Sequence, residues 1–129
     1  MGRVTAIPKR IKTAVLKRDN YRCMLRLDGC LGEATEADHR ANRGAGGSKI
    51  LNAPECLVAA CVLCNGKKET VHGAVLGQLK DHGLRVVKAA TNAATLERCR
   101  ETPVVYPDGT VRKLLADGTS ELLYTEPPF

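Results

Sequence analysis

Residues 36–68 read EADHRANRGAGGSKILNAPECLVAACVLCNGKK and contain three groupings with a clear chemical meaning. They are the pair Asp38-His39, a glycine-rich basic loop, and a Cys-x-x-Cys knuckle that is followed at once by Asn65. A carboxylate and an amide offer oxygen ligands for a hard cation, and a histidine offers a nitrogen base. Together these side chains are the parts of a metal-dependent hydrolase.

The order of the sequence motifs, DHR, then RG-x-GGS, then C-x-x-C-N-x-x-K, resembles that of the HNH endonucleases, which are ββα-metal nucleases. The segment resembles especially the small versions of this family that are common in phages of actinobacteria. The resemblance is clear over residues 15–69 and fainter to about residue 105. It implies that His39 is the general base, and that Asp38 and Asn65 are ligands of a catalytic Mg²⁺ or Mn²⁺ ion.

The cysteines predict a second, structural metal site. Cys61 and Cys64 have the spacing of an ordinary zinc knuckle, whereas Cys23 and Cys30 are separated by six residues, more than the usual two to four. The resemblance includes the same wide first pair. We therefore expect one Zn²⁺ bound by all four thiolates, with free buried thiols as the alternative.

The chain also has the composition of a small nucleic-acid-binding protein. It carries a formal charge of +6 with a pI near 9.1, and its basic residues cluster before the first cysteine and in the central loop. Such clustering favours binding to a phosphate backbone over a basic surface kept for solubility. The candidate DNA contacts are Arg40, Arg43, Lys49 and Lys68.

The core is expected to need support, because the 129 residues include only one Phe, three Tyr and no Trp. We find neither a secretory signal nor an apolar run near the roughly 20 residues of a membrane span. We therefore expect no membrane association and an intracellular, reducing location, which would be the host cytoplasm for a phage protein. The resemblance also suggests phage packaging proteins as partners.

The expected fold class is α+β: a small ββα-metal (HNH) fold with the four-cysteine zinc knuckle, an N-terminal helix and a C-terminal β-hairpin or meander. Residues 1–83 would form the nuclease domain and residues 84–129 an extension packed on it or following it. Spacing and turn residues predict a basic helix over 9–18, strands over 34–39 and 57–60 around a loop, and a helix from 66 to 83. The extension is expected to contain a strand over 84–88, a helix over 91–99, and two or three strands within 103–124.

Some residues have a competing interpretation. Asn65 would stand near the start of the 66–83 helix, where an asparagine often serves as a cap. His72 and His82 are interpreted as surface or packing residues, and Cys99 as a small buried apolar group.

The chain departs from the family pattern at one position. An asparagine that braces the catalytic loop usually lies five residues before the first cysteine of the knuckle, and here Cys56 occupies that position. Asn52, four residues further upstream, is the candidate substitute.

The motifs predict a metal-dependent DNA endonuclease that nicks or cuts duplex DNA, with His39 as general base. A zinc-ribbon nucleic-acid-binding module without catalysis is the main alternative. A zinc-stapled protein-interaction domain is the third. The Asp-His pair and the basic glycine loop favour the nuclease, because a purely structural knuckle needs neither.

Overall fold

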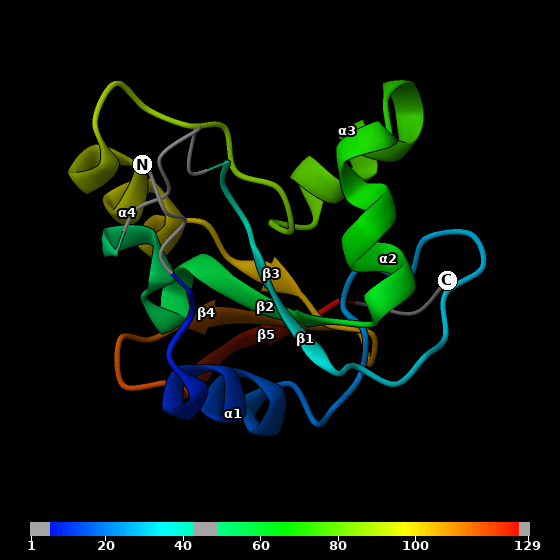
Figure 1. The fold of residues 1–129 in the computed structure, drawn as a ribbon, viewed down its shortest axis with the longest axis horizontal. Coiled ribbons are helices and arrows are strands. Elements are labelled where there is room, and N and C mark those ends of the chain that lie inside the picture. Colours follow the sequence, from blue (N-terminus) through cyan, green and yellow to red (C-terminus); the bar gives the residue numbers. More distant parts are fainter. Residues whose placement is uncertain (1–5, 43–48, 127–129) are drawn as a thin grey trace.

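The computed structural model describes residues 6–42 and 49–126 (Figure 1). Its elements, in chain order, are α1 (Lys9–Arg18), β1 (Glu36–His39), the 3-10 helices η1 (Ile50–Asn52) and η2 (Pro54–Cys56), β2 (Leu57–Ala60), α2 (Val62–Lys67), the 3-10 helix η3 (Lys68–Thr70), α3 (Gly73–Asp81), α4 (Asn92–Glu101), β3 (Val104–Val105), β4 (Thr110–Leu114) and β5 (Ser120–Thr125). This order confirms the α+β class, with the predicted N-terminal helix and C-terminal meander.

The β1-β2 hairpin lies at the centre of the fold. The two strands are antiparallel, and His39 at the end of β1 is opposite Leu57 at the start of β2. All four residues of β2 are buried, because elements pack on the hairpin from more than one side. Neighbouring side chains on a strand point to opposite faces. Asp38 accordingly is buried while His39 is only half-buried.

Helix α1 packs against both strands of the hairpin (Figure 1). Its first turn follows Pro8, a residue suited to a helix start, and Val15 is its fully buried residue. Arg18 at its end donates to the carbonyls of Pro54 and Leu57 at 2.9 and 2.6 Å. Helix α1 is therefore attached to the hairpin through its last turn as well as through its apolar face.

The C-terminal extension shares the main core with the rest of the chain. Its three strands form one antiparallel sheet in the order β3-β4-β5. Leu84, Val104 and Leu114 belong to the same buried cluster as Val15 and Leu57. The extension thus packs on the first 83 residues.

Gly83 occupies the turn where the two parts meet. Its φ of +73° lies in the left-handed region, and a Cβ there would approach the Pro103 carbonyl oxygen to 1.9 Å. This confirms Gly83 as the residue that ends the helical region.

The predicted helix over 66–83 is wrong in its bounds. Helical structure already begins with α2, continues into η3, and is interrupted before α3 starts at Gly73. The reason is the knuckle: the Cys61 Sγ accepts a hydrogen bond from the Cys64 backbone N–H and caps α2. Asn65 therefore lies inside α2 and is not a cap, which removes the competing interpretation of that residue.

The predicted strand over 84–88 is also wrong, because this segment joins no sheet in the described part of the chain. Instead the Val86 N–H donates to the Arg40 carbonyl at 2.7 Å, and Leu84 is buried. Apolar residues in a short run are compatible with burial in any conformation, and here tertiary packing holds them without a strand partner.

No helix within residues 6–42 and 49–126 is both long enough and apolar enough to cross a lipid bilayer.

Candidate functional site

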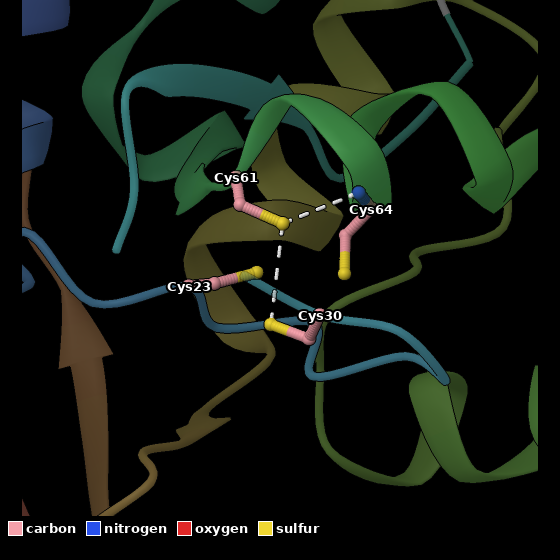
Figure 2. A group of neighbouring side chains, drawn as sticks. All are labelled: Cys23, Cys30, Cys61 and Cys64. Carbon is pink, nitrogen blue, oxygen red and sulfur yellow. Dashed lines mark hydrogen bonds between the residues drawn. The ribbon is translucent and has the colours of Figure 1, made fainter. Parts of the chain in front are cut away.

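Four cysteines converge at the start of α2. The Sγ atoms of Cys23, Cys30, Cys61 and Cys64 all lie within 4.8 Å of one another (Figure 2). A tetrahedral zinc ion with bonds of about 2.3 Å requires sulfur atoms roughly 3.8 Å apart. The Cys30 and Cys61 sulfurs are 4.0 Å apart, so the cluster is close to that geometry. The four cysteines can bind a metal such as zinc, and the wide spacing of the first pair is no obstacle.

Backbone N–H groups donate hydrogen bonds to sulfur atoms of this cluster and so stabilise the thiolate form. The Gly32 N–H donates to the Cys30 Sγ at 3.3 Å, as the Cys64 N–H does to the Cys61 Sγ. Burial opposes ionisation of Cys61, yet hydrogen bonds from the Leu31 and Cys64 backbones lower its pKa to about 6. Burial raises the pKa of Cys64, so that thiol would ionise most readily with a cation beside it.

Asp38, in β1, belongs to a second site, which is built from side chains of different kinds. Its side chain is buried, and the Lys68 ammonium contacts its Oδ1 atom. Its Oδ2 atom is also buried, and no described residue donates a hydrogen bond to it. Burial raises the Asp38 pKa to about 6, against the attraction of Lys68. One carboxylate oxygen therefore has no donor within residues 6–42 and 49–126 and can take a ligand.

The His39 ring is held in one orientation by Asn52. His39 Nε2 and Asn52 Oδ1 are 2.8 Å apart. The Asn52 Nδ2 donates to the Ala6 carbonyl at 3.3 Å, which leaves the amide oxygen facing the ring. With the amide oxygen as the acceptor, Nε2 is the donor of this hydrogen bond, and in a neutral ring the lone pair would then lie on Nδ1.

This contact bears on the departure from the family pattern. The structure brings Asn52, and not Cys56, to the histidine. Cys56 lies in a separate buried cluster with Cys99, confirming Cys99 as a buried group. The hydrogen bond with the Cys99 thiol, together with burial, raises the Cys56 pKa.

Lys68 joins the two members of the Asp-His pair. Besides contacting the Asp38 carboxylate, its ammonium donates to the His39 carbonyl at 2.6 Å. Asn65 is half-buried and precedes Lys68 by three residues, and residues three apart in a helical run lie on one side of it. The predicted Asn65 ligand therefore belongs to the same side of this helical run as the residue that contacts Asp38.

The prediction that Arg40 contacts DNA is wrong. The side chain is fully buried, and its guanidinium donates to the carbonyls of Gly83, Glu55, Cys99 and Thr102 at 2.6 to 2.9 Å. A guanidinium enclosed in this way cannot reach a phosphate. Arg40 instead ties the hairpin to α4 and to the turn after α3.

The other predicted DNA contacts have different surroundings. Lys49 is exposed and lines a pocket of about 380 Å³ together with Arg10 and Asn52. Arg43 lies outside the described residues. Lys68 is mostly buried against Asp38.

A second pocket, of about 310 Å³, was not foreseen from the sequence. It opens between α3 and residues 84–88, and its cationic lining residues are Lys68, Lys80, Arg85 and Lys88. The sequence contains no motif that would join them, because their charges come from three separate segments.

Comparison with family models, curated proteins and solved structures finds no match for this chain. Its assignment to the HNH endonucleases therefore stays a prediction from the sequence motifs.

Proposed function

We propose that the protein is a metal-dependent DNA endonuclease of the HNH type that hydrolyses phosphodiester bonds. The observation that carries this proposal is the buried Asp38 Oδ2, which has no hydrogen-bond donor among the described residues, next to a histidine oriented by Asn52. A buried carboxylate oxygen without a partner is costly unless it has a ligand. The adjacent histidine supplies the base that hydrolysis requires.

The donor set fits a hard divalent ion. Asp38 and Asn65 offer oxygen atoms, which Mg²⁺ and Mn²⁺ prefer, and a site with few protein ligands leaves room for phosphate oxygens and water. A bound ion would stabilise negative charge on the phosphate and on the leaving oxygen.

The remaining roles belong to side chains of the chain itself. His39 Nδ1 would accept the proton of the attacking water, while Nε2 stays hydrogen-bonded to Asn52. Lys68 would fix the position of the Asp38 carboxylate relative to the His39 backbone, because its ammonium contacts both. The four cysteines would bind a structural zinc ion that holds α2 against the 23–30 segment.

One observation favours a second candidate, a zinc-stapled nucleic-acid-binding module without catalysis. The Asp38–Lys68 ion pair by itself gives the aspartate a structural partner. In that case the basic surface would bind DNA, and His39 would serve only in packing.

A plasmid-nicking assay with added Mg²⁺ or Mn²⁺ separates the two candidates. We expect His39→Ala to lose roughly 100- to 10,000-fold in rate, the usual contribution of a general base. His72→Ala is the matched control, because His72 is an exposed histidine at the start of α3. Wild-type protein that binds DNA but never nicks it, or a His39→Ala variant that nicks at the wild-type rate, would overturn the proposal.

A further inference from the structure

The pocket between α3 and residues 84–88 is adjacent to the Asp38-His39 site, because one residue, Lys68, belongs to both. Lys68 lines this pocket, and the same ammonium contacts Asp38 and the His39 carbonyl. A long molecule bound at Asp38 could therefore extend past Lys68 into this pocket.

The lining of the pocket is strongly cationic. It has four basic side chains and one carboxylate, that of Glu69, which is 3.3 Å from Arg85 and more than half exposed. Lys80 and Lys88 are exposed, and neither forms an ion pair with any carboxylate in residues 6–42 and 49–126. These two ammonium groups remain available for an anion.

A second basic pocket also reaches the Asp38-His39 site. It is the one lined by Arg10 and Lys49, and it reaches the histidine through Asn52. In Figure 1, η1, which contains Asn52, and α3 lie on opposite sides of the end of β1. Each member of the Asp38-His39 pair thus contacts a residue that lines a basic pocket, an arrangement that suits a long polyanion better than a small one.

We propose that the pocket of Lys80 and Lys88 binds phosphates of the DNA strand flanking the scissile bond. The inference rests on the proposed function, because it takes DNA as the substrate and the Asp38-His39 site as the point of cleavage. The strand would pass from Arg10 and Lys49, across His39, to Lys80 and Lys88. Lysine suits this role, since its ammonium binds phosphate as a point charge without requiring a fixed orientation.

The salt dependence of DNA binding tests this inference. Fluorescence anisotropy of a labelled duplex, without added divalent ion, gives the dissociation constant of the full chain at several salt concentrations. Each phosphate contact contributes about 0.9 to the slope of log K against log salt for duplex DNA. We expect Lys80→Gln and Lys88→Gln each to reduce the slope by about 0.9, and the double variant by about 1.8.

Lys113→Gln is the matched control. Lys113 is exposed on β4 and lines neither basic pocket, so its removal changes net charge by the same amount elsewhere. We expect its slope to equal that of the wild type, and Lys88→Arg to keep the full slope.

These measurements distinguish failure of the pocket assignment from failure of the proposed nuclease function. Wild type that binds and nicks DNA, with unchanged slopes in the double variant, overturns the pocket assignment alone. A thermal shift with inorganic phosphate that the double variant loses, alongside unchanged DNA slopes, would make the pocket a small-anion site and also overturn it. Wild type that does not bind DNA at all overturns the proposed function together with this inference.

Discussion

The four-cysteine cluster and the Asp38-His39 site both connect α2 and η3 to earlier parts of the chain, yet they are built differently. The cluster consists of four ligands of one kind that face one another. The Asp38-His39 site has different side chains, a buried oxygen without a hydrogen-bond donor among the described residues, and a basic pocket beside each half. The first suits a permanent ion that supports folding, and the second suits a ligand that comes and goes.

The largest expected effect comes from the cluster. Cys64→Ser, or chelation of the wild type, should release zinc and unfold the protein, because binding of a structural zinc contributes about 10–16 kcal/mol of apparent free energy. Metal analysis and a thermal melt measure this. Cys99→Ala, which removes a buried thiol outside the cluster, should keep one zinc per chain. A melt that is insensitive to chelation would refute the assignment.

Arg40 gives the next largest effect, and it is an effect on stability only. Arg40→Met leaves four carbonyls without their donor, three of them in buried contacts, which should cost about 3 kcal/mol or more in the free energy of unfolding. Urea denaturation measures this loss. The exposed Lys49→Gln should change stability by less than about 0.5 kcal/mol but reduce the salt dependence of DNA binding. The reverse pattern would return Arg40 to the DNA interface.

Substitution of Asn52 should have a smaller effect, and one that is limited to the Asp38-His39 site. Asn52→Ala removes the hydrogen bond to His39, and an increase of about 1.4 kcal/mol in the activation barrier would lower the nicking rate tenfold. Zinc content should not change, which separates this variant from those of the cluster. A rate equal to that of the wild type would mean that the ring orientation does not depend on Asn52.

Cys56 gives the smallest expected effect on the rate. Cys56→Ala removes a thiol that lies in the second buried cluster with Cys99, away from the histidine. We expect the nicking rate to stay within about twofold of the wild type, because a change of less than about 0.4 kcal/mol in the barrier has no larger effect. A loss comparable to that of Asn52→Ala would show that both residues brace the loop.

Features that depend on neighbouring residues could be read from the sequence. Helix α1, strand β2, the helix-ending Gly83 and the three-stranded meander follow from local spacing and turn chemistry, and all are present. The four cysteines could be grouped in the same way, because ligand type and the short spacing of Cys61 and Cys64 identify half the cluster and the motif resemblance supplies the rest.

Only tertiary structure decided the features that depend on contacts across the chain. Arg40 follows the Asp-His pair in a basic motif, and nothing local distinguishes an arginine that meets DNA from one that binds carbonyls up to 62 residues away. The pairing of Asn52 with His39 spans 13 residues and a loop. The basic pocket beside Lys68 exists because residues 84–88 pack against α3 without forming a strand. Local pattern determines which elements form, whereas the free energy of packing those elements together determines which charges are buried and which are left at the surface.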